Sequence, residues 1–380
     1  MGQDVDVLIV GGGVVGCALA YYLARARAEV MLIERGEPNC EASGVNAGSL
    51  HLQLTAPYFA HSPRDKLKTS VSNLIPLSLE AAQVWRELSR ELDRDIELKV
   101  SGGLMVAETE KELRLLSEKA KIERKAGLET EILSRSDLRA VAPYLSDRFI
   151  GAEHCPGEGK VNPLVATLAL ASGALKAGVH LRHRTELVDL KRETTGFLAI
   201  TTQGSIRCRR VVNAAGSFVG RVAGMVGARL PVAARAQHMN VTEPARAFIF
   251  HLLQHAGQRL TLKQATNGSV IVGGGLPAQL DNASGRISVL RESLEGSLGT
   301  AVGVVPALGK LRLVRAWAGQ AVITDGNPIL GEHPAVPDFY NAVPASSGYT
   351  TGPICARLLA DLLLGQRSSS DLRAFSVERF

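Results

Sequence analysis

Three glycines near the amino terminus have the spacing of a nucleotide-binding turn. Gly11, Gly13 and Gly16 follow the pattern G-x-G-x-x-G, and Glu34 comes 21 residues after Gly13. In such a turn the first glycine allows a tight bend, the second lets the backbone approach a pyrophosphate, and the third lets a helix pack closely on a strand. A carboxylate at position 34 accepts ribose hydroxyls and repels a 2′-phosphate. The spacing therefore predicts NAD or FAD binding and disfavours NADP.

A nearly uncharged loop follows this turn. Residues 41–53, EASGVNAGSLHLQ, contain one acid and no lysine or arginine. Small residues let the backbone approach a ligand closely, and serine and asparagine side chains donate hydrogen bonds to it. The loop ends near His51, for which a half-buried structural histidine and a polar group near a substrate or cofactor are both open interpretations.

A second small-residue turn lies near the carboxyl terminus. The segment SSGYTTG, residues 346–352, offers backbone N–H groups and hydroxyls before a predicted helix over 351–365. A ligand contacted from both ends of the chain must be long, or must lie across a folded-back chain. This arrangement favours FAD over NAD.

The elements that position these residues follow from the hydrophobic pattern. The run 5–10, apolar except for Asp6, predicts a buried parallel strand, followed by a helix to about Arg27 and a strand that ends in Glu34. The charged segment 110–127 predicts an amphipathic helix whose charges form a solvated face. The pattern further predicts helices at 74–93 and 285–298, a helix then a strand within 159–190, strands at 102–108, 197–202 and 205–213, antiparallel strands within 236–275, a strand-rich stretch at 310–331, and a strand, turn and helix over 338–365.

Composition bounds the class of protein. The chain has 380 residues, 46% of them hydrophobic, and a net charge of +6. This length and composition predict a soluble protein of two domains. No block of lysine and arginine is present, so nucleic acid is not an expected partner. The apolar amino-terminal stretch is interrupted by glycines and has acids, not bases, in front of it, and no other long apolar run follows. We therefore expect neither a signal peptide nor an integral membrane protein.

The five cysteines are dispersed along the sequence. Cys17, Cys40, Cys155, Cys208 and Cys355 form no C-x-x-C pair. We expect no metal site and no iron–sulfur cluster within this chain. Dispersed cysteines also suit a reducing compartment, so a cytoplasmic location is expected.

Landmarks along nearly the whole chain resemble those of the D-amino-acid-oxidase-like flavoproteins, which include glycine and sarcosine oxidases. They are the G-x-G-x-x-G turn with Glu34, the loop 43–49, Val161-Asn162-Pro163, Asn213-Ala214-Ala215-Gly216, the segment 324–331 and Gly348-x-x-x-Gly352. Within the family, ASGVNAGSLHLQ looks most like the β subunits of D-hydroxyproline dehydrogenase and of opine oxidases.

The resemblance implies an α/β fold with two domains. The FAD-binding domain is Rossmann-like, of the glutathione-reductase and D-amino-acid-oxidase type, and is expected at 1–85, 145–225 and 312–380. The substrate domain, with a mainly antiparallel sheet, is expected at 86–144 and 226–311. The implied catalytic residues are His51, Gln53 and Tyr349, without a metal. Non-covalent FAD is expected to contact Gly11, Gly13, Val14, Val15, Gly16, Glu34, Arg35, Ser43, Gly44, Asn46, Ala47, Gly48, Ser49, Val188, Ala214, Ala215, Gly216, Asp325, Gly348, Tyr349, Thr350 and Thr351.

The resemblance also implies an activity. It is the dehydrogenation of a secondary-amine amino acid, D-hydroxyproline or an opine such as octopine or nopaline, with hydride passing from the C–H next to nitrogen to flavin N5. The chain would act as the β subunit of a complex, peripheral to the inner membrane through that complex. Alpha and gamma partner subunits would carry an iron–sulfur cluster, and FMN is expected only at or in partners. The alternatives are a stand-alone glycine or sarcosine oxidase that produces hydrogen peroxide, a flavin-bearing electron-transfer subunit inactive without its partner, and a colourless NAD-dependent dehydrogenase.

One segment departs from the family pattern. Amino-acid oxidases of the family typically read Gly-x-Arg-Pro-x-Thr-Pro-Asp-Gly, and that arginine holds the substrate carboxylate. This chain reads GQAVITDG over 319–326, one residue shorter, with Ala321 in the place of the arginine. A simple glycine or D-alanine oxidase is therefore disfavoured. The remaining candidates for a carboxylate anchor are Arg235, Arg259, Lys263, Arg315 and Tyr58.

Overall fold

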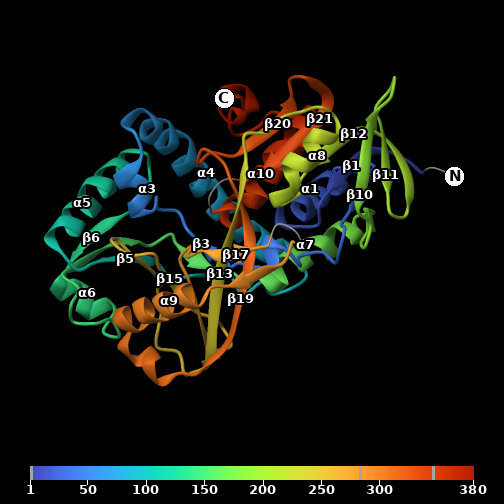
Figure 1. The fold of residues 1–380 in the computed structure, drawn as a ribbon. Helices are drawn as coiled ribbons and strands as arrows, with labels where there is room; N and C mark the ends of the chain where they lie inside the picture. Colours follow the sequence, from blue (N-terminus) through green and yellow to red (C-terminus); the bar gives the residue numbers. More distant parts are fainter. Residues whose placement is uncertain (1–2, 282–284, 345–346) are drawn as a thin grey trace.

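The structure, a computed structural model, describes residues 3–281, 285–344 and 347–380. Within these residues two eight-stranded sheets make up two parts of the molecule (Figure 1). The first sheet combines parallel and antiparallel strands, and the second is mainly antiparallel. The α/β fold with a mainly antiparallel second sheet, predicted from the sequence, is confirmed.

The first sheet is built around a parallel core. Its order is β10-β11-β12-β1-β2-β9, with β21 paired to β12 and β20 to β21. The pairs β9–β2, β2–β1, β1–β12 and β12–β21 are parallel. The strands are β1 (Gln3–Val10), β2 (Val30–Ile33), β9 (His180–Arg182), β10 (Leu187–Arg192), β11 (Phe197–Thr201), β12 (Gly204–Asn213), β20 (Ile329–His333) and β21 (Val336–Val343).

Both faces of this sheet are covered, which explains why the four residues Val7–Val10 of β1 are all apolar. Val7 and Ile9 pack against the helices of one face, whereas Leu8 and Val10 join a second core on the other. Helices from both ends of the chain, α1 (Val14–Arg25) and α10 (Gly348–Leu363), lie side by side on the first face (Figure 1). Two more helices, α7 (Pro163–Lys176) and α4 (Arg64–Glu91), pack beside them. The core on the other face includes apolar residues of α8 (Val219–Met225) and of the antiparallel strands β10 and β11 at the end of the same sheet.

The second sheet has the order β19-β13-β16-β15-β14-β5-β7-β6. Alternate residues of β5 pack into cores on opposite sides, with Leu104 and Val106 in one and Met105 and Ala107 in the other. The strands are β5 (Gly103–Ala107), β6 (Glu131–Ser134), β7 (Gly151–Cys155), β13 (Ala233–Pro244), β14 (Leu252–His255), β15 (Thr261–Gln264), β16 (Ser269–Gly273) and β19 (Leu313–Ile323); the helices beside them are α3 (Ala56–His61), α5 (Glu110–Lys125), α6 (Arg135–Val141) and α9 (Arg291–Val304).

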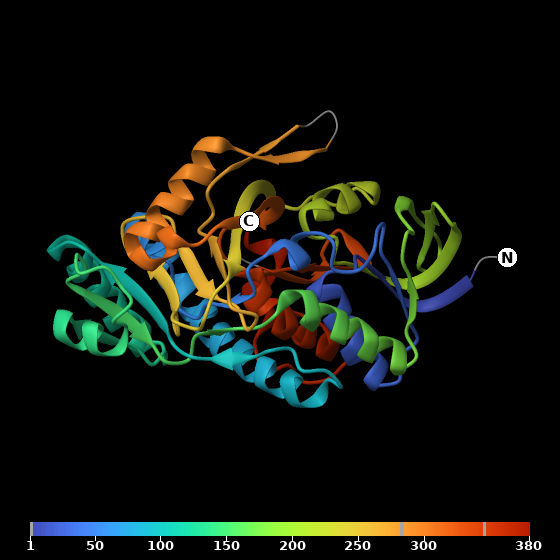
Figure 2. The same ribbon diagram turned by 90° about the horizontal axis from the view of Figure 1, so that it is seen from below.

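Shorter elements complete the fold. A three-stranded sheet joins the loop after the nucleotide turn to the second part, and the hairpin β17–β18 stands out beside α9 (Figure 2). These elements are α2 (Ala42–Val45), β3 (Ser49–Leu50), β4 (Lys99–Val100), β8 (Gly159–Lys160), β17 (Ala278–Leu280) and β18 (Ile287–Val289).

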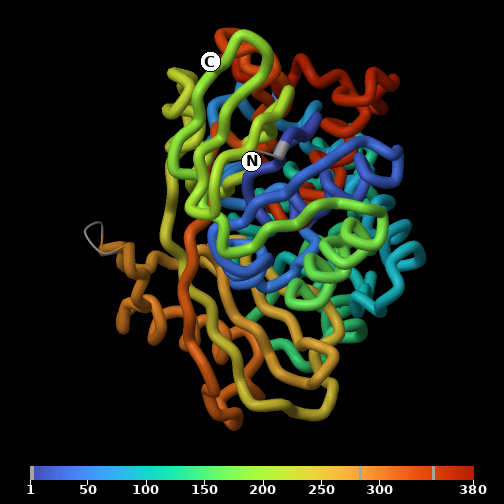
Figure 3. Tube along the Cα trace, turned by 90° about the vertical axis from the view of Figure 1, so that its right-hand side faces the viewer, coloured from blue at the N-terminus to red at the C-terminus, as the bar shows by residue number. Residues whose placement is uncertain are grey.

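The long antiparallel pair β13–β19 links the two parts. Figures 1 and 3 show the two strands running side by side along the height of the molecule. The pairing extends from Ala233 opposite Ile323 to Thr242 opposite Leu313. The pair forms one edge of the second sheet, and its strand β19 also contacts α2 in the loop that follows the nucleotide turn.

Several sequence-based expectations need correction. The predicted helix over 285–298 is wrong at its start, because β18 occupies Ile287–Val289 and α9 begins at Arg291. The fully solvated charged face of the segment 110–127 is also wrong, because Lys119 and Glu123 are completely buried. The antiparallel strands expected within 236–275 are confirmed, since β13–β16, β16–β15 and β15–β14 all pair antiparallel, and β14 pairs in addition in parallel with β5.

Some strands cross the expected division of the chain. Strands β7 and β19 lie within segments expected in the FAD-binding domain, yet both pair within the second sheet. The division into two domains stays a prediction. Among the described residues, no helix is both long and apolar enough to cross a membrane.

Candidate active site

The nucleotide turn joins β1 to α1 under tight steric constraint. Gly11 has φ +116°, and a Cβ atom there would lie 2.5 Å from the carbonyl oxygen of Ala214. A Cβ atom on Gly16 would lie 1.9 Å from the carbonyl oxygen of Gly11. Larger residues do not fit at either position, so the turn brings the first N–H groups of α1 to the edge of the sheet.

Glu34 is held at this turn by backbone hydrogen bonds. Its two carboxylate oxygens accept from the N–H groups of Gly12, at 2.7 Å, and Gly36, at 2.8 Å. The next residue, Arg35, forms an ion pair with Glu41 and stacks over the ring of Phe218 at 4.0 Å. All of these side chains lie along one cavity.

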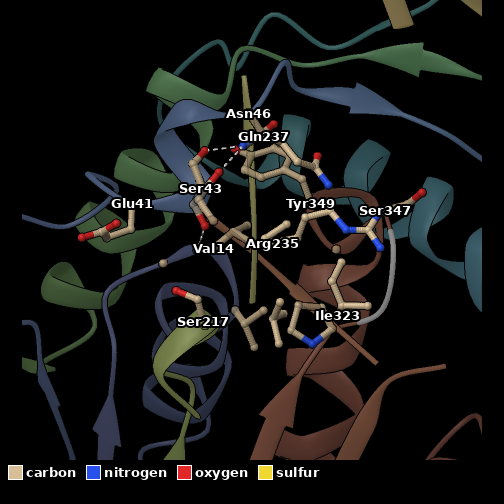
Figure 4. Close-up of a pocket in the computed structure, with 18 of the residues that line it drawn as sticks. Val14, Glu41, Ser43, Asn46, Ser217, Arg235, Gln237, Ile323, Ser347 and Tyr349 are labelled. Atoms are coloured by element: carbon tan, nitrogen blue, oxygen red, sulfur yellow. Dashed lines mark hydrogen bonds between the residues drawn. The ribbon is translucent and has the colours of Figure 1, made fainter. Parts of the chain in front are cut away.

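The uncharged loop closes over the start of α1. The Ser43 hydroxyl accepts a hydrogen bond from the Val14 N–H at 2.9 Å, and Figure 4 shows Ser43 next to Val14. The Asn46 side chain accepts from the Gly48 N–H at 2.6 Å, which fixes the following turn. Strand β19 supports the loop from behind, since the Trp317 indole donates to the Val45 carbonyl at 2.8 Å.

The start of α10 contributes the opposite wall. Gly348 and Tyr349 line the cavity, whereas the next residue, Thr350, is buried behind it and holds the loop. The Thr350 hydroxyl accepts from the His51 N–H at 3.1 Å and donates to the Ser49 carbonyl at 3.2 Å. Two turns far apart in the sequence are thereby held together.

Tyr349 lines the cavity, but its hydroxyl is already hydrogen-bonded within the protein. The ring stacks on Trp85 with centroids 5.5 Å apart. The hydroxyl lies 3.0 Å from the Thr167 hydroxyl and donates to the Pro163 carbonyl at 3.4 Å. Burial raises the pKa of Tyr349, so the phenol stays protonated at neutral pH.

His51 is a neutral, oriented group on the cavity wall. The Gln254 amide donates to His51 Nδ1 at 3.0 Å, which leaves Nε2 as the protonated nitrogen. Burial, and second the proximity of Lys263, lower the pKa of His51 to about 4. His51 is therefore uncharged near pH 7 and can donate a hydrogen bond through Nε2–H.

Gln53 lies outside the cavity lining, in a buried charged cluster. Its side-chain oxygen accepts from Lys119 Nζ at 3.4 Å, and Lys119 also bonds Glu123 at 2.8 Å and Glu153 at 2.7 Å. The four side chains are all buried. Glu123 and Glu153 raise the pKa of Lys119 against the opposing effect of burial, so it stays charged.

One continuous cavity of about 660 Å³ connects these groups, within the range of small-molecule and cofactor sites. Its nucleotide end is lined by Gly11–Val15, Glu34, Arg35, Ser43, Thr185–Leu187 and Arg221. Its substrate end is lined by His51, Met105, Arg235, Gln237, Met239, Gln254, His255, Arg259 and Ala321. Figure 4 draws Arg235 and Gln237 of β13 on the same cavity as Val14 and Ser43.

The structure brings most of the residues expected for the cofactor to this cavity. They are Gly11, Gly13, Val14, Val15, Glu34, Arg35, Ser43, Asn46, Ala47, Ser49, Ala214, Ala215, Gly216, Gly348 and Tyr349. The cavity is not lined by Gly16, Gly44, Gly48, Thr350 or Thr351.

Two expected cofactor residues lie away from the cavity. The Val188 side chain is 51% exposed, and its neighbour Leu187 lines the cavity instead. Asp325 forms an ion pair with Arg379 at 2.8 Å and does not line the cavity. The alternation of a strand explains the first case, because adjacent residues point to opposite faces.

Two of the five candidate carboxylate anchors reach the cavity, Arg235 and Arg259. Lys263 is buried beside it without lining it, and burial lowers its pKa strongly. Arg315 stacks on Trp317, and the Tyr58 hydroxyl lies 2.6 Å from that of Ser70.

Sequence reasoning missed Gln254 and His255. Both line the cavity and both are almost fully buried at the end of β14. The sequence offered one signal, because two polar residues directly follow an apolar pair in this short strand. Polar side chains that are buried in a strand need hydrogen-bond partners, so such a pair is a candidate for a site.

Comparison with known proteins defines the family. Residues 6–362 match the family described as DAO, FAD dependent oxidoreductase. The chain belongs to this family. It is an FAD-dependent oxidoreductase, and the expected FAD cofactor is thereby confirmed.

Similar proteins span almost the full chain. Glycine oxidase of Geobacillus kaustophilus (strain HTA426) is 29% identical over 98% of this chain and 97% of its own length. The B subunit of opine oxidase from Rhizobium meliloti is 28% identical over 99% and 98%. The crystal structure of the Geobacillus glycine oxidase superposes with a TM-score of 0.85 at 26% identity, covering 100% of this chain and 99% of that one.

The residues of the nucleotide end fit FAD. Besides the glycine turn and Glu34, the cavity-lining Ser49 hydroxyl is buried and has no hydrogen-bond partner among the described residues. Buried hydroxyls are normally satisfied, so this atom points to a polar ligand. Glu34, Ser43, Ser49 and the first turn of α1 would hold the cofactor. Within the described ranges, no three potential metal-ligating side chains cluster together.

Proposed function

We propose that the protein dehydrogenates the C–N bond of a secondary-amine amino acid. The observation that carries the proposal is the continuity of the cavity, which joins the nucleotide end to the substrate end on the second sheet. Two relatives support an amine substrate. One is the opine oxidase relative described above, and the other is the beta subunit of sarcosine oxidase from Rhizobium meliloti (strain 1021), 25% identical over 99% of this chain and 88% of its own length.

Bound FAD supplies the hydride acceptor for this reaction. The residues of the chain bind and orient the substrate. His51 presents a neutral Nε2–H, and Gln254 keeps its ring in one orientation. Met105 and Met239 provide apolar surface that excludes water from the same space.

The charge of the substrate end favours the reactive form of an amine. Arg235 and Arg259 line it, and none of the described residues that line this end is an acid. Nearby positive charge disfavours a second cation, so these arginines lower the pKa of a bound ammonium group. An amine must be neutral to lose hydride from its adjacent carbon.

We further propose that the chain acts with partner subunits in the cytoplasm. The opine oxidase and sarcosine oxidase relatives are both named as subunits of larger enzymes, which supports an assembly. Alpha and gamma partners that carry an iron–sulfur cluster would accept the electrons. D-hydroxyproline, octopine and nopaline are the substrates to test first.

A stand-alone glycine-type oxidase is the second candidate. The similarity to glycine oxidase over almost the full length of both chains favours it. The alanine at position 321 on the cavity wall argues against it, because no positive charge reaches the cavity from that position.

An anaerobic half-reaction tests the proposal. The purified chain is freed of oxygen, its flavin is identified as FAD after release, and the visible flavin absorption is followed on adding D-hydroxyproline, octopine, nopaline, L-proline, sarcosine or glycine. We expect bleaching by at least one secondary amine and slow reoxidation by oxygen. Reoxidation is measured by mixing the reduced protein with air-saturated buffer and following the return of the flavin absorption.

The outcomes separate the candidates. Bleaching by glycine with rapid reoxidation and hydrogen peroxide release would favour the stand-alone oxidase. FAD without bleaching by any amine, both alone and after co-expression with partner subunits, would contradict amine dehydrogenation.

A further inference from the structure

Two arginines reach the substrate end from different elements. Arg235 on β13 lies opposite Ala321 of β19, and both line the cavity. Directly opposed residues of an antiparallel pair carry their side chains on the same face, so the small Ala321 leaves the space beside Arg235 open. Arg259 lines the cavity from the turn between β14 and β15.

The positive charge of these two arginines is not balanced within the cavity. At the nucleotide end, Arg35 pairs with Glu41 and Arg221 pairs with Glu186. Arg235 has neither a hydrogen-bond nor an ion-pair partner among the described residues. Arg259 donates only to a neutral group, the Gly275 carbonyl, at 3.0 Å.

The turn that carries Arg259 is built into a fixed shape. Nδ1 of the buried His255 accepts from the N–H groups of Gly257, at 2.9 Å, and Gln258, at 3.1 Å. The other ring nitrogen of His255 lies 2.7 Å from the Glu108 carboxylate. These hydrogen bonds fix the backbone of the turn from which the exposed Arg259 side chain reaches the cavity.

We propose that the substrate end binds a secondary amine that carries two carboxylates, one held by Arg235 and the other by Arg259. This inference rests on the proposed function and names its substrate class. Two unbalanced guanidinium groups, with no acid among the described residues of that end, complement a dianion. Opines share this chemistry, whereas sarcosine, hydroxyproline and proline carry a single carboxylate.

A matched pair of unreactive ligands tests the inference without turnover. Thiodiacetate has two carboxylates on a central sulfur, and methylthioacetate has one. Neither contains an amine, so their affinities are measured on the FAD-loaded protein from changes in flavin absorption. We expect thiodiacetate to bind at least about tenfold more tightly, as expected for one additional charged hydrogen-bonded contact.

Single variants assign the two carboxylates. Arg235→Ala and Arg259→Ala should each weaken thiodiacetate binding by roughly tenfold to a hundredfold and bring the two ligands close to equal affinity. Arg235→Gln and Arg259→Gln preserve length and polarity and should behave the same way. The matched control is Arg315→Ala on the same strand pair, which lies off the cavity and should leave both affinities unchanged.

Three outcomes of the thiodiacetate and methylthioacetate measurements would overturn the inference. They are equal binding of the two ligands by the unaltered protein, no binding of either ligand, and unchanged thiodiacetate affinity in the arginine variants. Loss of FAD from Arg235→Ala or Arg259→Ala, but not from Arg315→Ala, would also overturn it, because the arginine would then serve the cofactor.

A second ligand pair separates this inference from the proposed function. Iminodiacetate and sarcosine differ only by the second carboxylate, and both are secondary amines. Thiodiacetate selectivity without flavin reduction by any amine would uphold the inference and contradict the proposed dehydrogenation. Equal flavin reduction by sarcosine and iminodiacetate at equal affinity would uphold dehydrogenation and contradict the dicarboxylate site.

Discussion

The hydroxyl of Ser43 accepts the Val14 N–H at 2.9 Å, so the loop after β2 caps the first turn of α1. This contact joins two segments 29 residues apart at the point where the cofactor phosphates are expected. The loop and the glycine turn therefore form one binding surface.

Ser43→Ala is expected to weaken FAD binding about fivefold. The variant removes a cap hydrogen bond worth about 1 kcal/mol and leaves the Val14 N–H without its partner. Titration of the apoprotein with FAD, followed by quenching of flavin fluorescence, measures the effect. Ser72→Ala is the control, since that exposed hydroxyl bonds only within α4. Equal FAD affinity of the Ser43 variant and the unaltered protein would count against the capping role.

Lys119→Met is expected to destabilise the protein by about 3–5 kcal/mol, because it leaves Glu123 and Glu153 buried without their cation. Urea unfolding measures the change. Lys121→Met on the exposed side of the same helix should change stability by less than about 0.5 kcal/mol.

A compensated variant checks the cause of this loss. Adding Glu123→Gln and Glu153→Gln to Lys119→Met replaces the two buried carboxyl groups that have lost their cation with neutral amides and should restore much of the stability. Unfolding midpoints that are the same for Lys119→Met and Lys121→Met would show that the buried cluster does not act in this way.

His51 makes stability depend on pH in the acidic range. Its pKa is about 4 in the folded protein and 6.5 in the unfolded reference, so the unfolded chain binds the proton more readily. The free energy of unfolding should fall as the pH drops from 6.5 to 4, by about 3 kcal/mol for this group. His51→Gln should show a flatter profile between pH 7 and pH 4.

The control for this profile is an exposed histidine. His61→Gln, at the end of α3, should follow the curve of the unaltered protein. Curves for His51→Gln and the unaltered protein that stay parallel across the range would refute the effect of His51 burial.

Tyr349→Phe is expected to change the rate of flavin reduction by less than about tenfold. A group that transfers a proton in the reaction contributes roughly 10²–10⁴-fold, and the Tyr349 hydroxyl already bonds the Thr167 hydroxyl and the Pro163 carbonyl. Anaerobic stopped-flow reduction measures the rate. Tyr349→Ala, which removes the stacking on Trp85, should lower FAD affinity instead. A hundredfold slower reduction in the phenylalanine variant would restore a catalytic role to the hydroxyl.

The nucleotide turn could be predicted because its requirements are local. Gly11 needs a positive φ, Gly16 needs the absence of a side chain, and Glu34 must end the second strand. Each of these constraints acts within one strand–turn–helix unit, so residue types and spacing are enough to reveal it.

The charged cluster could not be predicted because it depends on distant partners. The pattern of α5 places Lys119 and Glu123 among other charges on an ordinary amphipathic helix. Only the packing of β7 against α5 brings Glu153 to Lys119, which is 34 residues away in the sequence. The ion pair formed there offsets part of the free-energy cost of burying both side chains. A helical pattern carries no information about such a partner.

The sequence by itself determined the flavoprotein class, the parallel core of the first sheet and the position of the small-residue loop after the nucleotide turn. Only the tertiary structure decided which arginines reach the substrate end. Arg235 and Arg315 lie on the same strand pair and cannot be distinguished by residue type, yet one lines the cavity and the other does not. The physical reason is that the register and length of β13 and β19 place them at different distances from the nucleotide turn, and long-range pairing is not encoded in a local pattern.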